Sequence, residues 1–132
     1  MANEFRGRGN LGAAPALRQV EVGGESRSVA SLRIYFDRQV PDGDGGFEDR
    51  GGFWLDVNLW GPKAVAAAKI LPKGARVAAA GTLVHHTWTD KESGEERGRL
   101  ELQADSVDLD LGRLESIELR RKETREGERD DG

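Results

Sequence analysis

The chain has 132 residues, no cysteine, and 20 basic against 24 acidic residues, which leaves a formal net charge of −4. This length predicts one domain with a single modest core, and the missing cysteines exclude disulfides and thiolate metal sites. The first residues lack the apolar run of a secretion signal, and no stretch is long and apolar enough to cross a membrane, so we expect a cytoplasmic protein. The acidic balance does not suggest a nucleic-acid-binding protein by itself, although it permits a local basic groove.

The first predicted element is weak. An arginine–glycine alternation, Arg6-Gly7-Arg8-Gly9, leads into Asn10-Leu11-Gly12. Glycine weakens a strand interior, so this stretch indicates either an edge strand or a bend where another backbone comes close. Its two arginines fit either phosphate contacts or a solvated arm.

A hairpin and a long loop follow. Residues 17–22 and 26–38 predict two strands that are joined by a turn at Gly23-Gly24. The stretch 41–52 is rich in glycine and charge around one aromatic residue, Phe47. This composition predicts a long, mobile and exposed loop.

The stretch 53–60 is the most informative part of the sequence. Read with the period of two that a strand imposes, it has a core face formed by Phe53, Leu55, Val57 and Leu59. The other face carries Trp54, Asp56, Asn58 and Trp60. Two tryptophans on a polar face favour a flat apolar partner, which is either a stacked nucleobase or a covering subunit or loop.

One helix and two more strands complete the predicted elements. Residues 62–71 begin with proline, are rich in alanine and are followed by Pro72 and Gly74, which predicts a short helix. Residues 76–88 and 97–111 predict two strands around a turn at 90–94. A change of phase between Ala104 and Val107 indicates a bulge in the last strand.

This order of elements predicts an all-β fold, a five-stranded OB-fold barrel with one short helix between strands 3 and 4. We expect the OB-fold domain to cover residues 1–112. Residues 113–132 carry mixed charge and few apolar side chains, so we expect a charged tail that is either flexible or a frayed helix.

Several short motifs, spaced without large gaps from about Gly9 to about Leu111, resemble the bacterial single-stranded DNA-binding protein family. They are Gly9-Asn10-Leu11-Gly12 followed by Pro15 and Arg18, Phe53-Trp54, Leu59-Trp60-Gly61, Leu71-Pro72-Lys73-Gly74, and Trp88-Thr89-Asp90 before Gly94. The resemblance implies a cytoplasmic OB-fold homo-oligomer, usually a tetramer, although OB edges also permit a dimer. It also implies that the protein coats single-stranded DNA without sequence preference during replication, recombination and repair.

The resemblance assigns roles to particular residues. It implies that bases stack on Trp54, Trp60 and Trp88, each stack contributing about 1 to 3 kcal/mol. By position, the candidate phosphate contacts are Arg18, Lys63 and Lys73, with Arg6, Arg8 and Arg33 as weaker candidates. A further stacking tryptophan that the family places near Val40 is absent, and Phe47 is its candidate substitute.

The end of the sequence departs from the family pattern. The family tail closes on a proline and a phenylalanine that recruit partner enzymes, whereas this chain ends Glu128-Arg129-Asp130-Asp131-Gly132. The sequence therefore gives no support for recruitment of partner enzymes by that route. The short tail and the acidic body resemble a divergent member of the family, such as those carried on mobile elements.

No enzyme signature is present, because the acidic residues are concentrated in loops and tail, without a convergent nucleophile and base. His85 and His86 are adjacent on a strand and point to opposite faces, so we expect no metal site, and no cofactor. One other function stays open. An OB-fold adapter in a replication or conjugation complex would bury the tryptophans against a partner protein, so the environment of the tryptophans separates the two hypotheses.

Overall fold

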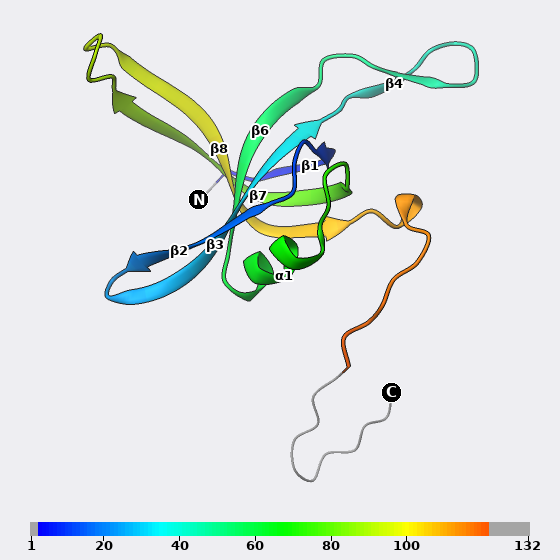
Figure 1. The fold of residues 1–132 in the computed structure, drawn as a ribbon. Coiled ribbons are helices and arrows are strands. Elements are labelled where there is room, and N and C mark those ends of the chain that lie inside the picture. Colours follow the sequence, from blue (N-terminus) through cyan, green and yellow to red (C-terminus); the bar gives the residue numbers. More distant parts are fainter. Residues whose placement is uncertain (1–2, 122–132) are drawn as a thin grey trace.

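Six strands form one curled sheet in the computed structural model, which describes residues 3–121 (Figure 1). The order across the sheet is β1-β7-β8-β6-β3-β2, and β1 also pairs with β3, which closes the sheet into a barrel. The strands are β1 (Phe5–Leu11), β2 (Ala16–Val22), β3 (Glu25–Phe36), β6 (Phe53–Trp60), β7 (Arg76–Thr89) and β8 (Glu96–Leu109). With β1 and β2 counted as two halves of one strand, interrupted at 12–15, this is the five-stranded order of the OB-fold.

The N-terminal stretch is a strand that pairs with β7 over residues 5–10 and with β3 only over residues 9–11. Its first half is therefore an edge, and the predicted close approach of another backbone occurs at Gly9. At Gly9 the strand pairs with Val77 of β7 and with Phe36 of β3. A Cβ on Gly9 would stand 2.2 Å from the carbonyl oxygen of Tyr35. Glycine is therefore the residue that lets β1 reach β3 and close the barrel.

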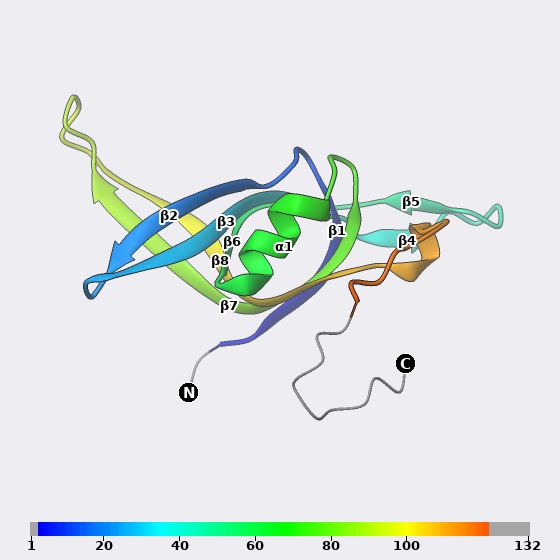
Figure 2. The ribbon, with the colours of Figure 1, turned by 60° about the horizontal axis from the view of Figure 1, so that its bottom comes forward.

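The single α-helix of the described chain, α1 (Pro62–Ile70), lies between β6 and β7 in sequence and packs against β2, β3 and β6 (Figure 2). Proline stands at its start, and Ala64 and Ala67 are its buried residues. Such small side chains allow the helix to lie close to the sheet. The helix agrees with the prediction, apart from its last residue.

The core is built from the inward-facing residues of the strands. Leu55, Val57 and Leu59 are buried as predicted, together with Ile34, Val77 and Leu102. Phe53 is half-exposed, because it lies at the end of the barrel, where its ring packs against those of Phe5 and Phe36.

The predicted bulge in the last strand is confirmed. Ala80 of β7 pairs with Ser106 of β8, whereas the next residue, Gly81, pairs with Ala104. Asp105 is therefore the extra residue on β8. Such a bulge bends a strand, as a barrel corner requires.

The stretch 41–52 contains more structure than the sequence predicts. Strands β4 (Gln39–Pro41) and β5 (Phe47–Asp49) form a two-stranded hairpin that projects from the barrel (Figures 1 and 2). The Asp42 carboxylate shapes its turn by accepting hydrogen bonds from the backbone N–H groups of Asp44 (2.7 Å) and Gly46 (3.1 Å). The stretch is mostly exposed, as predicted, but it is a strand hairpin and not simply a loop.

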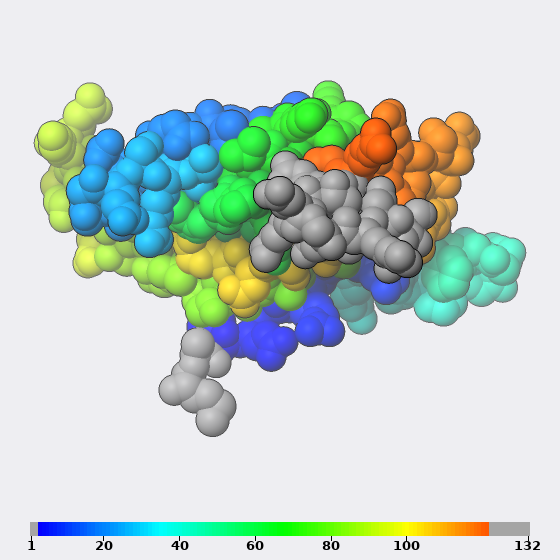
Figure 3. Space-filling model, turned by 90° about the horizontal axis from the view of Figure 1, so that it is seen from below, coloured from blue at the N-terminus to red at the C-terminus, as the bar shows by residue number. Residues whose placement is uncertain are grey.

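After β8 the chain forms one short 3₁₀ turn, η1 (Leu111–Arg113), and no regular element from 114 to 121. This segment lies beside the end of α1 (Figure 3), and together they line a cleft of about 540 Å³. Residues 122–132, which carry most of the predicted tail, lie outside the described residues. Within 3–121, no helix has the length and apolar character needed to cross a membrane.

Candidate nucleic-acid interface

The three tryptophans share one surface of the sheet. Strand register places Trp54 of β6 opposite Tyr35 of β3, and Trp60 opposite Val29. On its other side, β6 pairs with β8, which runs parallel to it. The far edge of β8 pairs with β7, where Trp88 is opposite Arg97. We call this surface the outer face and define it by Arg18, Arg33, Tyr35, Trp54, Asp56, Asn58, Trp60, Trp88, Arg97, Arg99, Glu101 and Gln103.

All three indole rings remain accessible to solvent. Trp54 is 49% exposed, Trp60 39% and Trp88 41%. No loop among residues 3–121 covers them. The loop-cover interpretation therefore does not hold for the described chain, and each ring offers surface to a molecule that arrives from outside.

Trp54 is held from several sides. Its ring centroid lies 5.3 Å from that of Tyr35, and the guanidinium carbon of Arg33 lies 5.5 Å from it. A Cβ on Gly12 would stand 2.6 Å from the Cζ3 atom of Trp54. The ring therefore rests against the backbone of the chain where β1 ends.

The other two tryptophans have polar neighbours. The indole N–H of Trp60 donates a hydrogen bond to Gln103 Oε1 at 3.2 Å. The ring of Trp88 lies 5.8 Å from that of His86, and the guanidinium carbon of Arg99 lies 5.8 Å from the Trp88 ring centroid. These contacts orient both rings and leave part of each ring free.

A carboxylate connects the two arginines that lie over tryptophans. Asp56 binds Arg33 through Oδ1 at 2.8 Å and Arg99 through Oδ2 at 3.7 Å. Arg99 also pairs with Glu101 at 3.0 Å. A continuous strip of contacts, from Trp54 through Arg33, Asp56 and Arg99 to Trp88, therefore crosses the outer face.

Three of the predicted phosphate contacts, Arg18, Arg33 and Lys63, lie on or beside this surface. Arg18 on β2 is the register partner of Val29, which is in turn the partner of Trp60, so Arg18 and Trp60 share the outer face two strands apart. Lys63, in the first turn of α1, donates a hydrogen bond to the carbonyl oxygen of Asp105 at the bulge, at 3.0 Å. The structure thus brings Arg18 and Arg33 onto the face of the tryptophans and Lys63 onto the bulge of β8.

The remaining candidates lie elsewhere. Lys73 is in the turn after α1 and lines the cleft beside segment 113–118. Arg6 and Arg8 project from β1, and Arg6 pairs with Glu4 at 3.6 Å. Phe47 lies on the β4–β5 hairpin and is 69% exposed.

Sequence reasoning missed Arg97 and Arg99 as members of this surface. The signal was present, because Leu100 and Leu102 alternate with them and so place them on the face opposite the core. The alternation cannot predict that Arg99 lies beside Asp56, because this depends on the register between β6 and β8. These two strands are separated in sequence by the helix and by β7.

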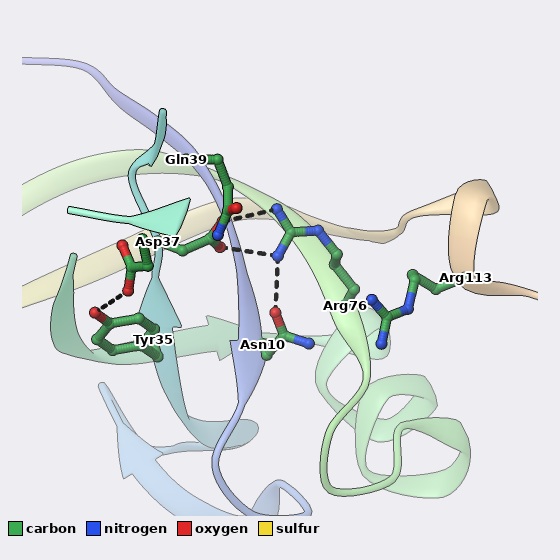
Figure 4. A pocket seen from close by; sticks show the side chains of 7 residues that line it. Asn10, Tyr35, Asp37, Gln39, Arg76 and Arg113 are labelled. Atoms are coloured by element: carbon green, nitrogen blue, oxygen red, sulfur yellow. Dashed lines mark hydrogen bonds and ion pairs between the residues drawn. The ribbon is translucent and has the colours of Figure 1, made fainter. Parts of the chain in front are cut away.

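A second polar cluster lies at one end of the barrel (Figure 4). Arg76 donates to Asn10 Oδ1 at 2.7 Å and to both carboxylate oxygens of Asp37, at 2.8 and 3.2 Å. The hydrogen bond from Arg76 holds the pKa of Asp37 below its usual 3.8. Asn10 of β1, Arg76 of β7 and Asp37, the residue after β3, are thereby joined, so this cluster ties these strands together at the end of the barrel.

The same cluster borders a cleft of about 510 Å³, which Tyr35 joins from β3. The Tyr35 hydroxyl donates a hydrogen bond to the Asp49 carboxylate, which raises the pKa of Tyr35 above its usual 10.0. Asp49 also accepts from the backbone N–H of Arg38 at 2.9 Å. These bonds tie the β4–β5 hairpin to the strand that borders Trp54. Among residues 3–121, no group of three or more histidine, cysteine or acidic side chains is placed to hold a metal ion.

A closed OB-fold sheet with three half-exposed indoles and several arginines on one surface defines a class, that of OB-fold proteins with a candidate surface for single-stranded nucleic acid. Comparison with known proteins specifies the family. The model of the single-strand binding protein family matches residues 3–110. The chain belongs to the single-strand binding protein family, which consists of non-enzymatic DNA-binding proteins.

Individual relatives agree with this assignment. The single-stranded DNA-binding protein of Wolinella succinogenes is 34% identical over 101 residues, which cover 76% of this chain and 59% of that protein. That of Corynebacterium glutamicum is 36% identical over 104 residues, or 75% of this chain and 43% of that protein. Single-stranded DNA-binding protein 1 of Synechocystis is 30% identical over 101 residues, which cover 76% of this chain and 77% of that protein. The chain spans about half the length of the first two relatives.

The fold has a counterpart among solved structures. The small single-stranded DNA-binding protein from Streptomyces coelicolor superimposes with a TM-score of 0.72 at 20% sequence identity. The match covers 86% of this chain and 99% of that one. At this identity the similarity supports the OB-fold and nothing finer.

Proposed function

We propose that this chain binds single-stranded DNA without sequence preference, by stacking bases on Trp54, Trp60 and Trp88. The observation that carries the proposal is the presence of all three indoles, each between 39% and 49% exposed, on one face of the sheet. Every base has an apolar ring face, so stacking tolerates any sequence and contributes about 1 to 3 kcal/mol per base. The family assignment supports the same conclusion.

Phosphate contacts supply the second part of the binding energy. Arg18, Arg33, Arg97 and Arg99 lie on the outer face, and Lys63 lies at the adjoining bulge. Lys73, Arg6 and Arg8 are further contacts for a strand that extends beyond the outer face, and Phe47 is a further stacking residue on the hairpin. Contacts of this kind release counterions, so affinity falls as salt rises.

The cellular role follows from this chemistry. A protein that covers bases and phosphates without sequence preference protects single strands exposed in replication, recombination and repair, in the cytoplasm. The family typically forms oligomers, and we propose a homo-oligomer, with a tetramer favoured over a dimer. Light scattering coupled to size exclusion tests the oligomeric state directly.

The test of the proposed function is fluorescence anisotropy of a labelled thymidine oligomer, titrated with the full chain at low and at high salt. Saturable binding that weakens with salt is expected. A Trp54→Ala, Trp60→Ala, Trp88→Ala triple variant that remains folded should lose most of the affinity. Absence of binding by the unaltered chain at low salt would overturn the proposal and favour the alternative, an adapter whose tryptophans contact a protein.

A further inference from the structure

Asp56 stands at the centre of the outer face, and its two oxygens bind two different arginines. Arg33 approaches from β3 at 2.8 Å and Arg99 from β8 at 3.7 Å. Each of these guanidinium groups lies over a tryptophan that we assign to base stacking, at 5.5 Å for Trp54 and 5.8 Å for Trp88. In the free chain, the arginines therefore already have an anion and an aromatic face as partners.

These are the two kinds of partner that a DNA strand offers. A phosphate oxygen and a carboxylate oxygen are both anionic acceptors for a guanidinium group. A base needs the ring face on which the guanidinium group now lies. A base that stacks on this part of the ring displaces the arginine from its indole, and a phosphate that binds the arginine displaces it from Asp56.

The carboxylate that loses its partner is left in an unfavourable place. Glu101 is the register partner of Asp56 on the neighbouring strand, so two carboxylates stand side by side. Glu101 accepts hydrogen bonds from Arg99 at 3.0 Å and from Asn58 at 3.3 Å. Once Arg99 binds a phosphate, Asp56 and Glu101 lose a positively charged partner. Their negative charges then repel each other and the phosphates of the DNA, which opposes binding.

We propose that Asp56 acts as an internal competitor for DNA, which holds Arg33 and Arg99 on the tryptophans and lowers the affinity of the outer face for single strands. The proposal rests on the proposed function of the same face. Its consequence is a protein that binds single strands but exchanges them easily, because each arginine always has a substitute partner within reach. The two ion pairs are half-exposed and contribute little to stability, so the effect of Asp56 is on binding.

The alternative role for Asp56, that of a positioning residue, predicts the opposite change in DNA affinity when Asp56 is replaced. A residue that merely positions the arginines for phosphate would strengthen binding, and its loss would weaken binding. Asp56→Asn separates the two roles, because it keeps the shape and one acceptor oxygen and removes the charge. Asp56→Glu keeps the charge.

The experiment is the anisotropy titration of a labelled thymidine oligomer over a series of salt concentrations, with circular dichroism to verify folding. For Asp56→Asn we expect binding that is about threefold to tenfold tighter at low salt. We also expect a slope of log K against log salt that is more negative by about 0.7 for each arginine that gains a phosphate. Asp56→Glu should bind the oligomer with an affinity and a salt slope close to those of the unaltered chain.

The matched control is Glu21→Gln, which changes the net charge by the same amount. Register places Glu21 of β2 opposite Ser26, on the side of the sheet away from Arg18. We expect it to change the affinity far less than Asp56→Asn does. Equal or weaker binding by Asp56→Asn, or an equal gain from Glu21→Gln, would overturn the competitor role while the proposed function stands. Failure of all four proteins to bind at low salt would instead overturn the proposed function, and the competitor role with it.

Discussion

Gly12 lies directly against the ring of Trp54, so that a Cβ at residue 12 would stand 2.6 Å from Cζ3 and 2.9 Å from Cη2. A separation this short is never tolerated, so any side chain at residue 12 must move the ring. The N–H of Gly12 donates a hydrogen bond to the carbonyl oxygen of Arg33 at 2.9 Å, which restrains the backbone of Gly12 from moving away from the Trp54 ring. The position of Trp54 on the outer face therefore depends on a glycine distant from it in sequence.

The first prediction follows from this contact. Gly12→Ala should displace Trp54 and weaken binding to a thymidine oligomer by about 1 kcal/mol, part of the contribution of one stacked base. The indole N–H resonance of Trp54 should shift in the free variant, while those of Trp60 and Trp88 stay in place. An unchanged Trp54 resonance would contradict the contact.

The second prediction compares the stacking residues. Replacement of Trp54, Trp60 or Trp88 by alanine should each cost about 1 to 3 kcal/mol of binding free energy, whereas replacement by phenylalanine should cost less, since a ring face remains. Phe47→Ala should cost less than any of the three, because Phe47 lies on the projecting hairpin. Titrations at one fixed salt concentration measure all of these costs. A loss for Phe47→Ala as large as that for Trp54→Ala would show that the hairpin is part of the main surface.

The third prediction concerns the phosphate contacts. Arg18→Gln should weaken binding and make the salt slope less negative by about 0.7, the value for one phosphate contact with a single strand. Lys73→Gln should have a smaller effect, since Lys73 lies in the turn after α1 and lines the cleft there. Salt titrations of both variants measure the difference. A larger change for Lys73→Gln would mean that the strand runs along the helix side of the barrel.

The fourth prediction concerns stability and pH. Arg76 holds the pKa of Asp37 below 3.8, so the carboxylate stabilises the fold at higher pH, and this stabilisation is lost as the pH falls through the lowered pKa. Asp37→Asn should therefore reduce the free energy of unfolding by about 1 to 3 kcal/mol at neutral pH. The difference from the unaltered chain should begin to shrink as the pH falls below about 3.8, and it should disappear below the lowered pKa of Asp37 in the folded chain, where both side chains are neutral.

Urea denaturation at neutral and at acid pH measures this dependence. Asp44→Asn is the control, because Asp44 is an exposed carboxylate in the turn of the β4–β5 hairpin. It should leave the stability nearly unchanged at both pH values. A pH-independent loss for Asp37→Asn would mean that the Arg76 ion pair does not stabilise the fold.

The parts of the fold that the sequence predicts correctly are those set by local pattern. The alternation in 53–60 identifies both faces of β6, because side-chain direction in a strand depends on the backbone alone. The phase change between Ala104 and Val107 identifies the bulge for the same reason. The same alternation places Trp54 and Trp60 on one face, whereas Trp88 could be added to them only through the resemblance to the family.

The parts that the sequence does not predict depend on distant partners. The β4–β5 hairpin is held by Asp49, which bonds to Tyr35 and to the backbone of Arg38, and nothing in the local composition indicates those bonds. The grouping of Arg33, Asp56 and Arg99 requires the register of β6 against both β3 and β8. Local pattern thus indicates which side chains face outward, and only the assembled sheet shows which of them contact one another.

We propose that all three tryptophans contact the same bound strand. The chain contains three tryptophans, so a two-dimensional ¹H–¹⁵N spectrum has three indole N–H signals, assignable with single Trp→Phe variants. Titration with a thymidine oligomer at low salt should shift all three signals, together and to saturation. Three signals that stay in place while the oligomer is in excess would contradict the claim, and would leave the outer face as a surface for a protein partner.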